Sequence, residues 1–126
     1  MLRAKDKQVL DERGHSWSVT STDQLDLLVI DDFTLPAGLE PGKTRLLLQL
    51  PLGFPDVQTD MFWVADRVMC ANGGHPAATD VSYTHPDGTT WWRWSRHFNQ
   101  WRNGIDGLPN VLDFVRHCLN ESVRAA

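Results

Sequence analysis

The sequence predicts an α+β fold with a short N-terminal helix, a four-stranded antiparallel meander and a C-terminal helix. Four apolar runs in the first half of the chain have strand length and are separated by short turns, as in strands that pair in sequential order. Near the end of the chain, apolar residues instead recur every three or four positions, which is the spacing of one helix face. They are Leu108, Val111, Leu112, Val115, Cys118 and Leu119.

The N-terminal helix is expected over residues 3–13, because the apolar residues of this stretch are followed by Gly14, which suits a helix end. Alternation of apolar and polar residues, or a short apolar run between turn residues, predicts each strand. The four strands are expected at residues 17–20, 25–30, 45–50 and 61–65.

Proline and glycine mark the connections between these elements. Residues 33–43 form a turn before the third strand, and residues 51–56 form a stiff connection after it. Residues 72–90 make up a long irregular region, and loops of that length in a small domain are usually functional or mobile. The C-terminal helix is expected to start with Asp106 as its cap and Pro109 in its first turn.

The composition predicts one globular domain over residues 1–126, a length that buries a core without disulfides. Hydrophobic residues make up 41% and charged residues 22% of the chain, which argues against disorder. Neither a membrane span nor a signal peptide is recognisable, so a cytoplasmic location without membrane contact is expected. The net charge of −4 argues against general binding to nucleic-acid backbones.

The two cysteines, Cys70 and Cys118, are too few for a disulfide framework and are not spaced as zinc ligands. Cys118 falls on the apolar stripe of the last helix, which favours a buried structural thiol. Cys70 lies at the start of the irregular region and is the better candidate for a reactive thiol. The histidines also lack metal-ligand spacing, so neither a metal nor another cofactor is expected.

Four of the six tryptophans fall within residues 91–101, whose sequence is WWRWSRHFNQW. In an extended chain the side chains divide into two sets: Arg93, Ser95 and His97 on one side, and Trp92, Trp94, Arg96 and Phe98 on the other. A helix would instead align Trp91, Trp94, Phe98 and Trp101. Periodicity leaves both interpretations open, and we favour an extended chain that turns helical near Phe98. In either case the tryptophans are expected in the core or as a wall beneath a site.

Ser95 and His97 are the candidate chemical residues, because a hydroxyl becomes a nucleophile when a base accepts its proton. Side chains two residues apart in an extended chain lie roughly 7 Å from each other, beyond hydrogen-bond distance. A preformed serine-histidine pair is therefore not expected, although an activated ester donor would reduce the need for one. An exposed serine and a surface histidine without a chemical role remain the alternative.

The order of elements and several motifs resemble the ubiquitin-conjugating-enzyme fold. RLLLQLPLGFPDV resembles that family's third strand and Tyr-Pro step, with Phe54 and Pro55 at the Tyr-Pro position, and MFWVA corresponds to its fourth strand. His85-Pro86-Asp87 resembles the family's His-Pro-Asn motif, with His75-Pro76 as a second candidate register. Counting back from Trp101, which resembles the family's tryptophan, places the catalytic cysteine within residues 92–95, where this chain has none.

The chain is still more similar to a bacterial branch, the prokaryotic family E of these enzymes. The motifs that carry this resemblance are LPLGFPD at residues 50–56, DMFW at residues 60–63 and WWRWSRH at residues 91–97. The similarity extends over about residues 17–119, and the last motif is the most specific. It implies a fold that is truncated relative to full-length relatives, which carry two further C-terminal helices.

The resemblance implies a role in a bacterial ubiquitin-like conjugation pathway, together with a ubiquitin-like protein, an activating enzyme and a metal-dependent deconjugating peptidase. One hypothesis is acyl transfer, in which Ser95 accepts the partner's C-terminal carboxyl as an oxyester and His97 moves protons. A variant of this hypothesis makes His97 the nucleophile. Arg93 and Arg96 would hold the oxyanion or the partner's tail. The binding residues would be Trp91, Trp94, His85 and Asp87. Asp87 replaces the family's asparagine, which puts stabilisation of the oxyanion by an amide in doubt.

The rival hypothesis is a non-catalytic adaptor that binds the ubiquitin-like protein or its activating enzyme. The missing cysteine motivates it. Binding of single-stranded nucleic acid is a third hypothesis, because arginines alternate with tryptophans in residues 91–102. The acidic net charge makes this third hypothesis the weakest.

Overall fold

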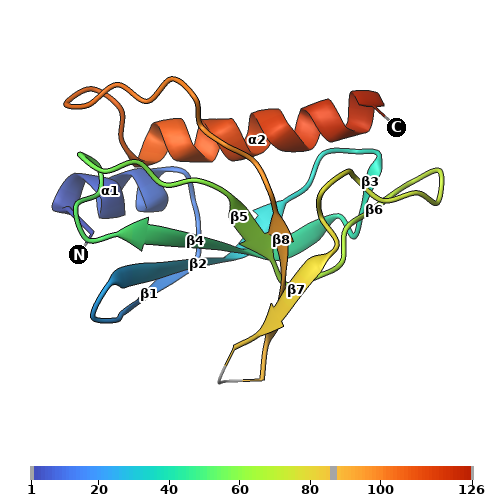
Figure 1. Cartoon of the computed structure of the whole chain (residues 1–126), viewed down its shortest axis with the longest axis horizontal. Helices are drawn as coiled ribbons and strands as arrows, with labels where there is room; N and C mark the ends of the chain where they lie inside the picture. Colours follow the sequence, from blue (N-terminus) through green and yellow to red (C-terminus); the bar gives the residue numbers. More distant parts are fainter. Residues whose placement is uncertain (1, 86–87, 126) are drawn as a thin grey trace.

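The computed structural model describes residues 2–85 and 88–125. Within these ranges the chain starts with helix α1 (Ala4–Glu12), continues through the strands and ends with helix α2 (Leu108–Ala125) (Figure 1). The strands are β1 (Trp17–Ser21), β2 (Leu25–Thr34), β3 (Leu39–Glu40), β4 (Lys43–Pro51), β5 (Phe62–Val64), β6 (Met69–Cys70), β7 (Val81–Thr84) and β8 (Thr90–Trp94). The α+β class predicted from the sequence is confirmed.

The main sheet has six strands in the order β1-β2-β4-β5-β8-β7, and every neighbouring pair is antiparallel. The four predicted strands are β1, β2, β4 and β5, which lie side by side in the predicted order, so the meander is confirmed. The two-residue strands β3 and β6 form a second, small sheet. It lies beside the C-terminal half of α2, because a Cβ atom on Gly38 would come within 2.9 Å of Val123.

Two predictions for the chain on either side of β8 are wrong, and the turn expected at residues 33–43 also contains the end of β2 and all of β3. The long irregular region contains strand β7, which pairs with β8 and adds a hairpin to the edge of the sheet. All four residues of β7 are exposed, so the strand has no alternation that a sequence pattern could reveal. The helical turn expected near Phe98 is also absent, because residues 95–107 contain turns and irregular chain but no helix.

The core lies between one face of the main sheet and the helices. Alternate residues of the strands are buried there, such as Leu28 and Ile30 on β2, and they meet the apolar stripe of α2. Helix α1 packs beside α2, where Arg13 forms an ion pair with Asp113 at 3.0 Å. No helix of residues 2–85 and 88–125 has the length and apolar character needed to cross a membrane.

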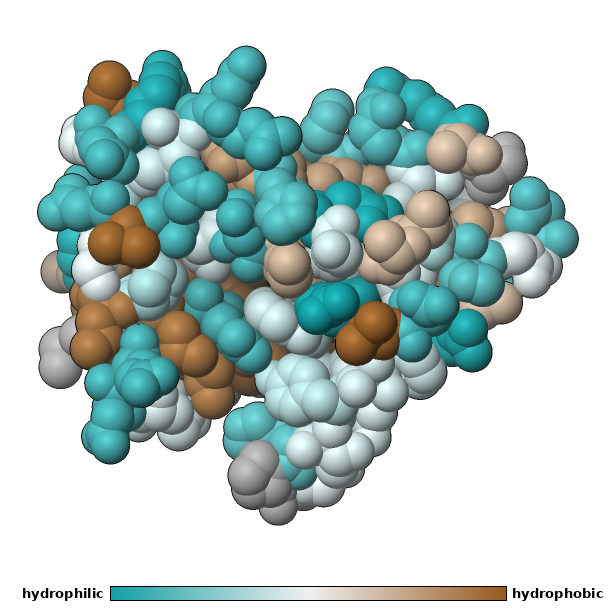
Figure 2. All heavy atoms as spheres, viewed as in Figure 1, coloured by the Kyte–Doolittle hydropathy of each residue, from teal (hydrophilic) through white to brown (hydrophobic). Residues whose placement is uncertain are grey.

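The hairpin formed by β7 and β8 projects from the body of the molecule. Figure 2 shows it as a lobe at the bottom of the view that is mostly pale, with hydrophilic side chains on one side of it. Strand β8 connects this lobe to the core, because it is paired with β7 on one side and with β5 on the other. The segment that follows β8, residues 95–107, contains no helix or strand and is called the irregular segment below. It therefore starts from a strand that is paired along both edges.

Candidate functional site

Strand β8 buries Trp91 and Trp94 on opposite faces of the sheet. Trp94 is fully buried in the core and stacks on Phe62 with ring centroids 5.3 Å apart. Trp91 is 2% exposed on the other face, where the guanidinium of Arg45 lies 5.2 Å from its ring centroid. Both rings are structural elements that stiffen the strand, and neither is open to solvent as a binding surface.

Arg93 lies on the sheet face opposite the core. Cross-strand partners in an antiparallel sheet share a face, and Arg93 is paired with Trp63 on β5 and with Val81 on β7. Its Nε is buried and has no hydrogen-bond partner among the residues that the structure describes. The side chain is therefore set among apolar neighbours and points away from α2.

The backbone of Ser95 and Arg96 is held from both sides by residues with unusual conformations. The N–H of Ser95 donates to the carbonyl oxygen of Ala78 at 3.1 Å, and the carbonyl oxygen of Arg96 accepts from the N–H of Met61 at 2.7 Å. Met61 has φ = 65° and Ala78 has φ = 55°, and in the described ranges they are the two non-glycine residues with positive φ. Such conformations are strained for residues with a Cβ and cluster at functional sites.

The guanidinium of Arg96 is bound to the backbone around it. Nη1 donates to the carbonyl oxygen of Ser95 at 3.1 Å, and Nη2 donates to that of Ala77 at 3.0 Å. The same group lies 5.0 Å from the ring centroid of Trp94. Arg96 thus joins the irregular segment to the loop before β7 and brings a positive charge next to Ser95.

His97 is exposed and lies next to Asp60, a residue that the sequence analysis mentioned only within the DMFW motif. The distance from His97 Nδ1 to Asp60 Oδ2 is 3.4 Å. The other carboxylate oxygen, Oδ1, accepts from the N–H of Phe98 at 2.8 Å and from Nε2 of Gln58 at 3.2 Å. The two partners are 37 positions apart in the chain, so no local spacing identifies the pair. The one available signal was an acidic residue directly before a strand.

A groove of about 600 Å³ lies between the irregular segment, the loop before β7 and the C-terminal half of α2. His97 and Arg96 line one side of it, and His117 and Cys118 line the side formed by α2. Ser95 and Arg93 are not part of this lining. The residues of the predicted polar face are therefore divided: His97 lines the groove, Ser95 lies outside its lining, and Arg93 lies on the outer face of the sheet. No three His, Cys, Asp or Glu side chains in the described ranges are arranged to hold a metal ion.

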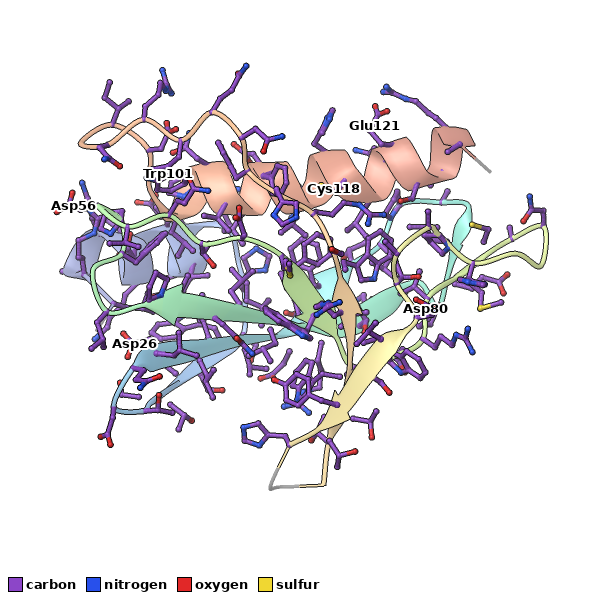
Figure 3. All side chains as sticks on the ribbon, viewed as in Figure 1. Asp26, Asp56, Asp80, Trp101, Cys118 and Glu121 are labelled. Atoms are coloured by element: carbon purple, nitrogen blue, oxygen red, sulfur yellow. The ribbon has the colours of Figure 1, made fainter. Side chains whose placement is uncertain are left out.

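Both cysteines are buried structural thiols. Cys70 is 6% exposed and Cys118 is 7% exposed, the latter at the helix side labelled in Figure 3. Burial raises the pKa of the Cys118 thiol, and the thiolate is the nucleophilic form. The interpretation of Cys118 is confirmed. The expectation that Cys70 is the more reactive thiol has no support, because burial protects it to a similar extent.

His85 lies at the tip of the hairpin, far from Ser95. Its N–H donates to the carbonyl oxygen of Thr89 at 2.7 Å, and its own carbonyl accepts from Gly88 at 2.9 Å. Thr89 precedes Ser95 by six residues of mostly extended chain, which corresponds to roughly 20 Å. The structure thus does not bring His85 to the candidate site, and Asp87 lies outside the described residues.

One of three comparisons with known proteins identifies the family of the chain. No curated protein and no solved structure showed a significant match to the chain. A family model described as prokaryotic E2 family E matches residues 2–122, which is nearly the whole sequence. The match includes α1, the six-stranded sheet, the irregular segment after β8 and most of α2. The chain therefore belongs to prokaryotic E2 family E.

Proposed function

We propose that this chain accepts the C-terminal carboxyl of a ubiquitin-like protein as an oxyester on Ser95 and passes it on. Membership in an E2-like family supports a role in a bacterial ubiquitin-like conjugation pathway. Both cysteines are buried, and burial raises the pKa of the Cys118 thiol, so we assign the covalent step to a nucleophile other than a thiol. Ser95 directly precedes Arg96 and His97, which line the groove along α2, and we assign its hydroxyl as the nucleophile.

The observation that carries this proposal is the strained backbone on both sides of residues 95–96. A left-handed conformation at a residue with a Cβ costs about 1–3 kcal/mol and persists only where the surrounding structure imposes it. Met61 and Ala78, which adopt this conformation, each form a hydrogen bond with one of two consecutive residues, Ser95 and Arg96. This supports a functional role for that dipeptide, because strain elsewhere in the described chain is not concentrated in this way.

The proposed step transfers an acyl group from a thioester to the hydroxyl of Ser95, which gives an oxyester. The Oγ of Ser95 attacks the carbonyl carbon of a thioester that links the ubiquitin-like protein to its activating enzyme. The Oγ–C bond forms, the C–S bond breaks, and the electron pair of that bond leaves on the sulfur. The hydroxyl proton passes to His97 and then to the departing thiolate, so that His97 returns to its starting protonation state while Ser95 carries the acyl group.

The proton has to cross the distance between the hydroxyl of Ser95 and the imidazole of His97. No hydrogen bond joins Ser95 to His97 among the described residues, and positions two apart in extended chain are separated by roughly 7 Å. One water molecule that bridges the two groups provides a route, since a base acts through one water as well as directly. Arg96 places its positive charge beside Ser95 and along the groove, which suits it to hold the partner's tail.

The test combines the protein with its activating enzyme, the ubiquitin-like protein and ATP. An adduct that resists thiol reductants and is cleaved by hydroxylamine is expected, because an oxyester has these properties. Ser95→Ala should abolish it, His97→Ala should slow its formation by about 10²-fold or more, and Cys70→Ala should leave it unchanged. Loss of the adduct in Cys70→Ala, or its persistence in Ser95→Ala, would refute the assignment.

A non-catalytic adaptor is the second candidate, and the missing contact between Ser95 and His97 favours it. In that case the groove holds the partner without a covalent step. The complex would then form equally well with Ser95→Ala, and it would be weakened by His117→Glu, which places a negative charge on the groove. Detection of the covalent adduct described above would exclude this alternative.

A further inference from the structure

We propose that Asp60 is a positioning residue that fixes the tautomer and orientation of His97, so that Nε2 is the nitrogen that accepts the proton. This inference rests on the proposed function for its chemical meaning, but the geometry behind it is independent of that function. Asp60 does not line the groove, and no hydrogen bond joins it to Ser95 among the described residues. It acts through the imidazole of His97, which does line the groove.

The carboxylate of Asp60 is oriented by donors on one oxygen, which leaves the other oxygen for His97. Oδ1 accepts from the backbone N–H of Phe98 at 2.8 Å and from Nε2 of Gln58 at 3.2 Å. Gln58 is itself anchored, because its Nε2 also donates to the carbonyl oxygen of Phe98 at 3.1 Å. Oδ2 is then directed to Nδ1 of His97, at 3.4 Å. Two residues adjacent in the chain, His97 and Phe98, are thus bound by one carboxylate.

The backbone around Asp60 is held in place on both sides. The hydroxyl of Thr59, which is buried, donates to the carbonyl oxygen of Gln49 on β4 at 2.8 Å. On the other side, Met61 adopts the left-handed conformation and donates its N–H to Arg96. The strain at Met61 directs the chain so that Asp60 faces the irregular segment immediately before β5 begins. An imidazole that acts as a base keeps one orientation only if the residue that binds it is itself held in place, as Asp60 is.

The charge of Asp60 decides which ring nitrogen carries the proton. A carboxylate only accepts hydrogen bonds, so the neutral imidazole beside it must present Nδ1–H. Its Nε2 is then an unprotonated acceptor that is available to the proton from Ser95. Serine-hydrolase triads use an aspartate in the same way, and replacing that aspartate by asparagine leaves the wrong tautomer.

Asp60→Asn separates this role from a merely structural one. The side-chain oxygen of asparagine can still accept from Phe98 and Gln58, so the hydrogen bonds that hold the loop are retained. The amide NH₂ then faces Nδ1 of His97 and donates to it, which makes Nδ1 the acceptor and moves the proton to Nε2. The fold is preserved while the tautomer is reversed. Asp23→Asn, at the exposed turn between β1 and β2, is the matched control.

The first measurement is nitrogen-15 NMR of histidine-labelled protein at about pH 8. His97→Gln identifies the signals. The expected result is an Nδ1–H tautomer in the unchanged protein and in Asp23→Asn, and an Nε2–H tautomer in Asp60→Asn. The same tautomer in all three proteins would overturn the proposal. This measurement needs no partner protein, so it decides the positioning role even if no adduct ever forms.

The second measurement is the rate of the adduct in the assay with activating enzyme, ubiquitin-like protein and ATP. Asp60→Asn is expected to slow the adduct about as much as His97→Ala, and the double variant should be no slower than either. Asp60→Glu should restore part of the rate, because it returns a carboxylate. A wild-type rate in Asp60→Asn alongside a slow His97→Ala would overturn the proposal. Absence of the adduct from the unchanged protein would speak against the oxyester function alone.

Discussion

The aromatic segment at residues 91–101 consists of two parts that differ in how they are held. The first part, β8 (Thr90–Trp94), is paired along both edges, and its two most buried tryptophans lie on opposite faces of the sheet. The second part, residues 95–101, has no strand or helix and is held by single contacts to distant residues. Asp60, Ala78 and Pro55 are among these distant partners.

The two parts serve different purposes: β8 stabilises the fold, and residues 95–101 carry the candidate chemical groups. The strand contributes buried area and backbone hydrogen bonds, and its side chains leave little polar surface for a reaction. The irregular part exposes Ser95 and His97 in part and holds them through hydrogen bonds from loops. We therefore expect substitutions in the first part to change the free energy of unfolding and substitutions in the second part to change activity. The following predictions test this division, from the largest effect to the smallest.

Trp94→Ala should have the largest effect on stability. Its side chain is fully buried and stacks on Phe62, and removal of a buried aromatic ring costs about 3–5 kcal/mol. Chemical denaturation followed by circular dichroism measures the loss. The comparison variant is His97→Ala, at an exposed site, which should change the free energy of unfolding by less than about 0.5 kcal/mol. Similar losses in both variants would contradict the division.

Acid should have the next largest effect, on the chain just before α2, where Arg102 and Asp106 form an ion pair. Hydrogen bonds from Arg102 lower the pKa of Asp106. A lowered folded-state pKa gives stability that is present above the ordinary aspartate range, near 3.9, and is lost as the pH falls through the folded value. The free energy of unfolding should therefore decrease below about pH 4, and Asp106→Asn should flatten this dependence. Urea titrations at a series of pH values measure both slopes, and identical slopes would contradict the assignment.

Trp101→Phe tests the anchor at the end of the second part. The indole Nε1 of Trp101 donates to the carbonyl oxygen of Pro55 at 2.9 Å, and its ring packs against Phe54 and Phe98. Phenylalanine keeps most of the ring contacts but loses the hydrogen bond, which is worth about 1 kcal/mol. Thermal unfolding should show a modest decrease in stability. The adduct assay should show a larger relative effect than Trp92→Phe, a variant of the paired strand.

The strain at Ala78 predicts a variant with a higher free energy of unfolding, whereas the preceding variants lower it. Ala78→Gly should stabilise the protein by about 0.5 kcal/mol, because glycine adopts φ = 55° without the Cβ clash. The neighbouring exposed residue Ala77 lacks a positive φ, and Ala77→Gly should destabilise the protein by about 0.4–1 kcal/mol through the entropy of the unfolded chain. Equal changes in the two variants would show that Ala78 stores no strain.

The sequence alone determined the parts of this protein that depend on local patterns. Helical spacing located α2, alternation and apolar runs located β1, β2, β4 and β5, and the motifs at residues 50–56, 60–63 and 91–97 identified the family that the comparison then showed. These signals are local, because the period of a helix or strand is written in neighbouring residues. The exposed strand β7 carries no such period, and the sequence missed it.

Only the tertiary structure decided how residues 95–101 are arranged. Parity correctly placed Trp92 and Trp94 opposite Arg93 for as long as the strand continued. Parity no longer applies after Trp94, where the chain leaves the sheet, and the predicted polar face is divided, because His97 lines the groove and Arg93 lies on the outer face of the sheet. The contact between His97 and Asp60 joins positions 37 apart, and the strain at Met61 and Ala78 arises from the loops that hold residues 95–96. Such contacts follow from the path of the whole chain, which no local spacing records.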